Sequence, residues 1–339
     1  MTVLLDFDSD RDVAFAHEDE RFARVMHVVH AAWHGIRSAT ACMPGHKMAI
    51  PHEGPLDGDF YRHAIGLVAA WRIEVVCFQG LSSNAFSLAN VLRSEFGSAL
   101  RILVITHVTS TQFENFFEIE MQHALLNALA KRVVDRAGSV KPGFDSVVPA
   151  YWPHTIYNSA PNIAAYRAGG YDPEAVFVPL ENSWRKNLYT NVLGACAVPE
   201  VQTVFTVNRP TGLDMIADIS KVRLCSYMRG MNLYTFMGAA ACVLNATLAE
   251  CQPMTELEAL AMGTPCITGP LALEAFADHP FTELTEVRQL DTPAAIAACL
   301  QRILQERRRD EAGFRAMLDD YLALRNARSI DSYLAFFEG

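Results

Sequence analysis

Apolar residues in the first half of the chain fall into short uninterrupted runs that alternate with segments of helical spacing. Short apolar runs between polar or glycine residues predict buried strands, whereas apolar residues three or four apart predict helices. Strands are therefore expected at residues 3–7, 73–78, 101–107 and 154–159. Helices are expected at residues 18–38 and 84–96, and in the stretch that runs to about residue 136. Residues 43–60 are rich in proline and glycine, which predicts a long loop.

The same alternation begins again after Gly169 and Gly170. Further strands are expected at residues 175–180, 201–207, 221–228 and 241–247, with helices at 187–197 and about 311–336. Apolar strands that alternate with helices indicate parallel sheets covered on both faces. We therefore expect an α/β fold with two doubly wound domains that face a cleft, in which ligands bind beyond the carboxyl ends of the strands. The predicted division is residues 1–170, residues 171–310, and a final helix at 311–339 that returns to the first domain.

Composition narrows the class of protein. A chain of 339 residues is long enough for two domains. No apolar run reaches the roughly 18–20 residues of a membrane span, and the acidic start "MTVLLDFDSDRD" does not resemble a signal peptide. The eight cysteines form no C-x-x-C pair, which favours reduced thiols and a cytoplasmic location. A formal net charge of −10 disfavours a protein that binds phosphate backbones, so no nucleic-acid partner is expected.

The segment "NATLAECQPMTELEALAMGTPCITGPL", residues 245–271, carries the most specific pattern. The expected strand at 241–247 delivers the chain to the carboxyl end of a sheet, which places Glu250 in a loop at the ligand-binding edge. Pro253 lacks an N–H group and argues against one continuous helix from 250 to 262. Glu250 taken alone would be read as a solvated loop carboxylate.

A short helix is expected to follow this loop. Thr255 and Glu258 fit a T-x-x-E capping box, which predicts that the helix starts at about Glu256. Gly263 and Pro265 are expected to end it. The free N–H groups and the positive dipole end of such a helix form an anion site. A helix cap with no binding role is the alternative interpretation of Glu258.

Together these residues resemble the E-x7-E signature of retaining nucleotide-sugar glycosyltransferases of the GT-B fold, the group 1 or family 4-like enzymes. The resemblance is close over residues 232–270, and residues 289–304 resemble the end of that family's donor domain. It covers the C-terminal half well and the N-terminal half only in outline. The resemblance implies two Rossmann-like domains, of which the first handles the acceptor and the second binds the nucleotide-sugar donor.

The resemblance also implies roles for individual residues. Glu250 matches the glutamate that contacts the transferred sugar near the reacting carbon, and Glu258 matches the one that binds the ribose hydroxyls. The backbone amides of Met254 and Thr255 match those that hold the sugar hydroxyls and the phosphate. The remaining positions expected to bind the donor are Cys251, Pro253 and Tyr227.

The leaving diphosphate requires a cationic partner. The segment "SWRKN", residues 183–187, resembles the family's lysine turn, so Lys186 is expected to act there with Arg185 beside it. The family usually has an arginine about five residues earlier, where this chain has Glu181, and Arg185 or Arg209 are the alternatives for that cation. A solvated basic pair is the structural alternative. Enzymes of this family generally need no metal, so none is expected, and no cofactor other than the donor is implied.

Histidines provide the candidates in the first domain. His107 ends the strand at 101–107 and matches a histidine that lies close to the sugar and the acceptor in some family members; a structural role is the alternative. By spacing, His27, His30 and His34 could share a helix face, and a packing role is preferred to a metal site. The family's glycine-rich turn after the first strand is absent. The predicted loop at 43–60 contains five further polar candidates, which either shape an acceptor site or have no such role: His46, His52, Glu53, Asp57 and Asp59.

These features predict a retaining, hexosyltransferase-like enzyme that moves a sugar from a UDP- or GDP-sugar to a saccharide, lipid-linked or other hydroxyl acceptor. Family membership implies a cytoplasmic enzyme of polysaccharide biosynthesis, with contact to the inner face of the membrane as a further option. Two alternatives stay open: a non-catalytic GT-B protein that binds a nucleotide sugar or a partner subunit, and a nucleotide-sugar epimerase on the same fold. The donor sugar, the acceptor and the oligomeric state do not follow from the sequence.

Overall fold

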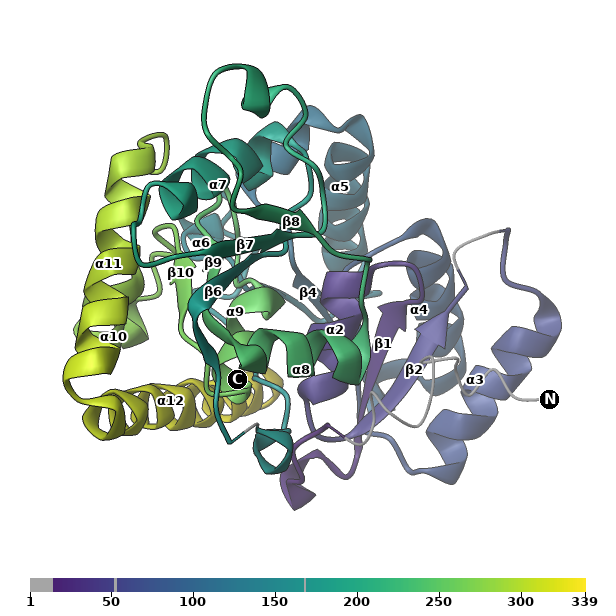
Figure 1. Cartoon of the computed structure of the whole chain (residues 1–339). Coiled ribbons are helices and arrows are strands. Elements are labelled where there is room, and N and C mark those ends of the chain that lie inside the picture. Colours follow the sequence, from purple (N-terminus) through teal and green to yellow (C-terminus); the bar gives the residue numbers. More distant parts are fainter. Residues whose placement is uncertain (1–14, 52–53, 168) are drawn as a thin grey trace. The chain divides into compact units, whose positions relative to one another are not determined.

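A computed structural model describes residues 15–51, 54–167 and 169–339. The strand expected at residues 3–7 lies outside these ranges. The chain divides into two compact units (Figure 1). The first unit comprises the residues up to Asn162 together with Arg328–Gly339, and the second unit comprises Ile163–Ala327. Each unit is built on a five-stranded parallel sheet, which confirms the predicted α/β fold class with two Rossmann-like domains.

The sheet of the first unit has the strand order β2-β1-β3-β4-β5. Its strands are β1 (Val25–His30), β2 (His46–Ile50), β3 (Val75–Gln79), β4 (Arg101–Thr106) and β5 (Arg136–Ser139). All residues of β1 and β3 are buried, as expected for central strands covered on both faces. The sequence predicted β3 and β4 correctly to within two residues.

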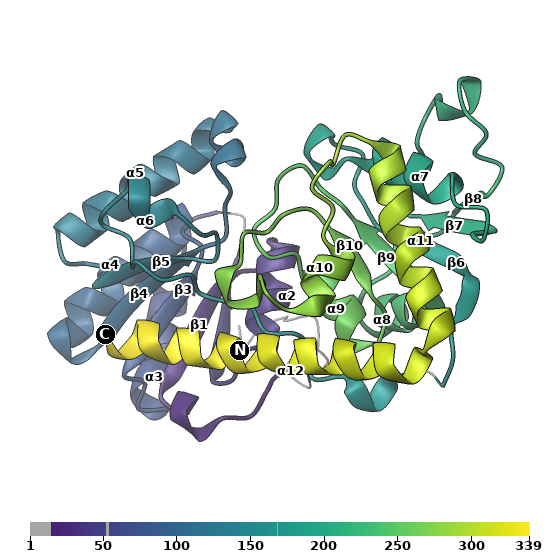
Figure 2. The same ribbon diagram turned by 90° about the vertical axis from the view of Figure 1, so that its left-hand side faces the viewer.

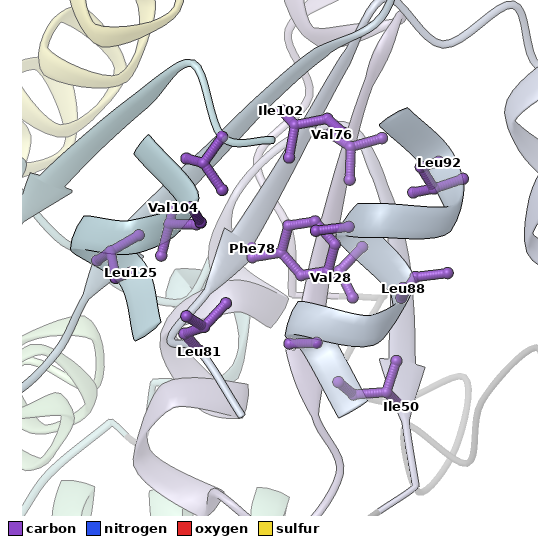
Figure 3. Close-up of a cluster of buried hydrophobic side chains, with 14 of the residues drawn as sticks. Val28, Ile50, Val76, Phe78, Leu81, Leu88, Leu92, Ile102, Val104 and Leu125 are labelled. Atoms are coloured by element: carbon purple, nitrogen blue, oxygen red, sulfur yellow. The ribbon is translucent and has the colours of Figure 1, made fainter. Parts of the chain in front are cut away.

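The helices of the first unit pack on this sheet through apolar side chains. They are α2 (His34–Cys42), α3 (Gly58–Ala70), α4 (Ser83–Phe96), α5 (Phe116–Ala130) and α6 (Phe144–Val147). Val28, Phe78 and Val104 lie in register on neighbouring strands. Figure 3 shows these side chains gathered with Leu88 of α4 and Leu125 of α5, and all of them are fully or almost fully buried. This cluster fixes the strands whose carboxyl ends carry the first unit's candidate residues.

Three predictions in the first unit are wrong. Residues 18–38 contain β1 between a short 3-10 helix, η1 (Glu20–Phe22), and α2, instead of one helix. Four of the six residues of this strand are apolar, so a helical spacing could also be found in it. The expected loop at 43–60 contains β2 and the start of α3, and the expected strand at 154–159 is irregular. Strand β5 is absent from the sequence prediction, because its sequence "RAGS" has no branched apolar residue to indicate a strand.

The sheet of the second unit has the order β10-β9-β6-β7-β8. Its strands are β6 (Asp172–Val178), β7 (Thr203–Thr206), β8 (Val222–Leu224), β9 (Ala240–Asn245) and β10 (Cys266–Thr268). The first four of these strands confirm the expected ones. The helices are α7 (Leu188–Cys196), α8 (Gly230–Ala239), α9 (Met254–Ala261), α10 (Pro280–Thr285) and α11 (Pro293–Arg309). Helices α7 and α11 approach closely at Gly194, where an added Cβ would lie 2.8 Å from Ile296 Cβ.

The last helix, α12 (Glu311–Glu338), is one uninterrupted helix in Figure 2. Its residues up to Ala327 belong to the second unit, and those from Arg328 belong to the first. Within the first unit, Ser329 donates a hydrogen bond to the Tyr157 carbonyl (2.7 Å), and Ser332 Oγ accepts one from the Tyr157 N–H (3.0 Å). Among the described residues, no helix combines the length and the apolar character needed to cross a membrane. The remaining short helices are η2 (Gly97–Ala99), η3 (Ser110–Glu114), η4 (Ala164–Tyr166), η5 (Trp184–Lys186), η6 (Leu213–Met215) and η7 (Glu274–Phe276).

Candidate functional site

The two loops that carry the predicted diphosphate and sugar residues follow neighbouring strands of the second unit. Strands β6 and β9 pair directly and in parallel, so their carboxyl ends lie at the same edge of the sheet. The chain leaves β6 toward Arg185 and Lys186, and it leaves β9 toward Glu250. The backbone joins the two loops, since the Leu248 N–H donates to the Arg185 carbonyl (2.9 Å). Residues 64 positions apart in sequence therefore meet at this edge.

Glu250 lies between the two predicted cations. Lys186 Nζ is 2.6 Å from Glu250 Oε2, and Arg185 Nη1 is 3.7 Å from the same oxygen. Arg185 also donates to the Ala249 carbonyl (3.1 Å). These three side chains are between 16% and 25% exposed, so the cluster is shielded but reachable from solvent. Two positive charges thus share one carboxylate, which leaves the cluster with a net positive charge.

Asn187 fixes the turn that presents these cations, and sequence reasoning did not single it out. Its backbone is left-handed (φ 57°), a conformation that asparagine tolerates better than most residues. Its side-chain amide donates to the carbonyls of Ala246 (3.0 Å) and Leu290 (2.6 Å). The turn that carries Lys186 is therefore tied to the loop that follows β9.

Helix α9 begins earlier than predicted. Its N-cap is Pro253 and its first residue is Met254, and no side chain caps it. The expected capping box is therefore wrong: Thr255 already has a helical position, and Glu258 lies in the middle of the helix. The fixed φ of Pro253 (−68°) sets the entry of the chain, which lets the helix start without a hydroxyl cap. The first N–H groups of the helix, on Met254 and Thr255, lack acceptors within it and are available to an anion.

The other predicted donor residues differ in their surroundings. Glu258, Cys251 and Pro253 are buried, and Thr255 is half-buried. Tyr227 is 66% exposed and follows β8, which the strands β6 and β7 separate from β9. The structure therefore brings Lys186, Arg185 and Glu250 together, with Glu250 in the loop that leads into α9, and it places Tyr227 farther along the same edge of the sheet.

His107 belongs to the first unit, where it directly follows β4. Its ring Nε2 is 2.9 Å from Gln79 Oε1, and Gln79 Nε2 is 3.1 Å from His27 Nδ1. Burial lowers the pKa of His107 to about 4. Burial, together with the charge of Lys47, lowers the pKa of His27 to about 3. Both imidazoles are therefore neutral at pH 7, so His107 Nε2 donates its hydrogen to Gln79.

The remaining histidines and acids of the first unit have local contacts. His27 and His30 lie on β1 and His34 starts α2, so the expectation of a shared helix face is wrong. His46 stacks on the Trp71 ring, with the ring centroids 4.4 Å apart. Asp57 caps α3 by accepting from the Phe60 N–H (2.8 Å), and Asp59 pairs with Arg62. His52 and Glu53 lie outside the described residues.

Two further observations concern possible ligands. Within the described part of the chain, no group of three or more His, Cys, Asp or Glu side chains could hold a metal ion. A pocket of about 540 Å³ lies beside β7 and β8, and Arg209, Arg223 and the buried Thr206 are among its lining residues. Lys186, Glu250 and Glu258 do not line this pocket.

Two parallel Rossmann-like sheets, with charged loops at the carboxyl edge of the second, define a GT-B class of fold, as the sequence resemblance predicted. No family model and no curated protein matches the chain. Three similar solved structures each match 93% of this chain and 98% of their own. They are HepE from Anabaena in complex with UDP and glucose (TM-score 0.57, 12% identity), sucrose-phosphate synthase from Thermosynechococcus elongatus (0.55, 15%) and the UDP-forming α,α-trehalose-phosphate synthase from Burkholderia vietnamiensis (0.56, 12%). At these identities the likeness establishes the fold.

Proposed function

We propose that this protein is a retaining glycosyltransferase that moves a sugar from a nucleoside-diphosphate sugar to a hydroxyl acceptor. The observation that carries the proposal is the cluster of Lys186, Arg185 and Glu250, with Glu250 in the loop that leads into α9. It combines cations and helix N–H groups for a diphosphate with a carboxylate for a sugar. The first unit then handles the acceptor, and the second unit binds the donor.

The chemistry of the leaving group requires these cations. Negative charge builds on the diphosphate as its bond to the sugar carbon breaks. Lys186, Arg185 and the free N–H groups of Met254 and Thr255 stabilise that charge with groups that are already in place. Glu258, one turn farther along α9, binds the ribose hydroxyls of the nucleotide.

Retention follows from a reaction on one face of the sugar. The bond from the sugar carbon to the phosphate oxygen breaks, and the acceptor oxygen bonds to the same face of that carbon. The acceptor's proton passes to the departing phosphate oxygen, so no separate base is required. Glu250 orients the sugar during this exchange, and His107 acts as a neutral hydrogen-bonding group on the acceptor side.

The solved structures support UDP as the first nucleotide to test, because HepE was crystallised with UDP and glucose and the trehalose-phosphate synthase is UDP-forming. A GDP-sugar is the second donor class. The proposed acceptor is a saccharide or a lipid-linked glycan. The proposed location is the cytoplasm, at the inner face of the membrane when the acceptor is lipid-linked.

The test incubates purified protein with a panel of UDP- and GDP-sugars and acceptors, and it measures the release of the nucleoside diphosphate. We expect release with at least one donor, and a product whose anomeric configuration by NMR matches that of the donor. Glu250→Ala should abolish transfer, and Glu274→Ala, at an exposed position of the same unit, should not. Transfer that survives Glu250→Ala would remove the assignment of this residue, and inversion of the anomer would contradict retention.

A further inference from the structure

Helix α9, whose first turn lies at the proposed diphosphate site, is held by charged side chains at both ends. The helix has eight residues, and its buried residues include Glu256 in its first turn. Glu256 directly follows Thr255, one of the two residues whose N–H groups face the anion in the proposed function. Any displacement of Glu256 therefore also displaces the N–H groups that are proposed to hold the diphosphate.

Arg325 of α12 holds the first turn. Its Nη1 lies 3.2 and 3.3 Å from the two carboxylate oxygens of Glu256 and 3.0 Å from the Tyr321 hydroxyl. The Arg325 guanidinium also lies over the Phe276 ring, 4.8 Å from its centroid. Arg325 has no exposed surface, and among the described residues its Nε and Nη2 have no hydrogen-bond partner. The position of this buried cation is therefore set by Glu256 and the surrounding rings.

Arg167 holds the other end of α9. Its Nε donates to the Ala261 carbonyl (2.7 Å) and its Nη2 donates to the Leu260 carbonyl (3.2 Å), both of which belong to the last turn. Its Nη1 pairs with Asp319 of α12 at 2.6 Å. A cation at this end also suits the helix dipole. Both attachments of α9 thus lead to α12, six residues apart.

We propose that Arg325 is a positioning residue, which fixes α9 so that the N–H groups of Met254 and Thr255 point at the diphosphate. The inference rests on the proposed function. A buried ion pair is a weak source of stability, because desolvation offsets much of its attraction, and apolar residues of similar size often replace it without loss. Its hydrogen bonds are directional, however, and apolar contacts are not. The pair therefore suits the precise placement of a short helix better than it suits stabilisation of the core.

The test removes both charges together. The double variant Arg325→Met with Glu256→Gln leaves no unpaired buried charge, and we expect it to fold. It should bind the nucleoside diphosphate about tenfold more weakly than the wild type, with the KM for the donor raised in parallel and kcat less affected. Hydrogen exchange of the amides at residues 254–257 should be faster than in the wild type, in the absence of any ligand.

A matched control is available in the same unit. Arg307 of α11 is also buried and pairs with Glu311, and it donates to the Ala241 carbonyl (2.6 Å) at the amino end of β9. Arg307→Met with Glu311→Gln should leave nucleotide affinity and exchange at 254–257 unchanged. If the double variant does not fold, Arg325→Lys replaces it, because this change keeps the charge beside Glu256 but removes the planar guanidinium, and an affinity loss of about threefold is expected.

Two results would overturn the inference. The first is a folded variant with wild-type affinity and wild-type exchange at residues 254–257. The second is an equal loss of affinity in the Arg307 control, which would show a general effect of disturbing the unit. A wild-type protein that binds no nucleoside diphosphate would instead refute the proposed function, and the inference with it, so the two failures are told apart by the wild-type titration.

Discussion

Replacing Glu250 with glutamine should tighten the binding of a free nucleoside diphosphate while it slows sugar transfer. In the structure the carboxylate of Glu250 already pairs with both cations, because its Oε2 lies 2.6 Å from Lys186 Nζ and 3.7 Å from Arg185 Nη1. An incoming diphosphate must displace this carboxylate and tolerate its negative charge nearby. Glutamine keeps the shape of the side chain and removes both obstacles.

The magnitude follows from the shielding of the cluster. Unit charges about 4 Å apart attract by about 1 kcal/mol in water and about 4 kcal/mol at the effective dielectric constant near a protein surface. Side chains that are 16–25% exposed fall between these limits, and desolvation reduces the net value. A net gain of about 1–2 kcal/mol corresponds to roughly 5- to 30-fold tighter binding.

Isothermal titration with UDP and GDP measures this change, and release of the nucleoside diphosphate from the sugar donor measures transfer. Glu274→Gln, at an exposed position of the same unit, is the control and should alter neither. Unchanged or weaker binding of the nucleoside diphosphate to Glu250→Gln would refute the reasoning, because it would mean that the carboxylate does not compete for Lys186 and Arg185.

Three further predictions concern stability. Burial lowers the pKa of His27 from 6.5 to about 3. The stability that comes from its neutral form is therefore fully present above pH 6.5 and is lost as the pH falls toward 3, by up to about 1.4 kcal/mol per pH unit. Urea unfolding from pH 7 to 4 should show a shallower loss for His27→Gln than for the wild type, and an equal loss would exclude His27 as a source of the pH dependence. Burial lowers the pKa of Lys47 from 10.5 to about 8. The free energy of unfolding of the wild type relative to Lys47→Met should therefore rise between pH 8 and 10.5, and at pH 7 the variant should be about 1–3 kcal/mol more stable than the wild type. A destabilised variant would contradict this. Gly194→Ala should lower the free energy of unfolding by about 1–3 kcal/mol, because the new Cβ meets Ile296. In the control Gly66→Ala, in α3, the new Cβ meets nothing within 4 Å, and the change should stabilise the protein by about 0.4–1 kcal/mol. Equal effects of the two changes in thermal unfolding would refute the close approach of α7 and α11.

The fold of the second unit followed from its sequence more closely than that of the first. Residues 240–244 are all apolar, and the structure has β9 there. In the first unit β5 reads "RAGS", and β2 begins with His46 and Lys47, so neither strand shows an apolar pattern. Strand β5 pairs with β4, and β2 pairs with β1. These pairings join segments that are distant in sequence, so a local pattern does not predict them.

The candidate site shows the same division between local and distant information. The approach of Lys186 to Glu250 was expected only through a resemblance, and the direct ion pair between them was not expected. The T-x-x-E pattern predicts that α9 starts at about Glu256, whereas the structure has Pro253 as the N-cap and Met254 as the first residue. The pairing of Glu256 with Arg325 joins residues 69 positions apart, and no local pattern could have indicated it.

Titration of nucleoside diphosphates tests the central claim, that the turn at Lys186 and the start of α9 form a diphosphate site. We expect the wild-type protein to bind UDP or GDP at a single saturable site. Lys186→Ala should weaken that binding by about 10- to 100-fold, since a hydrogen bond to a charged group contributes about 1.5–3 kcal/mol. Lys131→Ala, at an exposed lysine of the first unit, should leave it unchanged. Absence of binding by the wild type, or equal affinity in Lys186→Ala, would contradict the account.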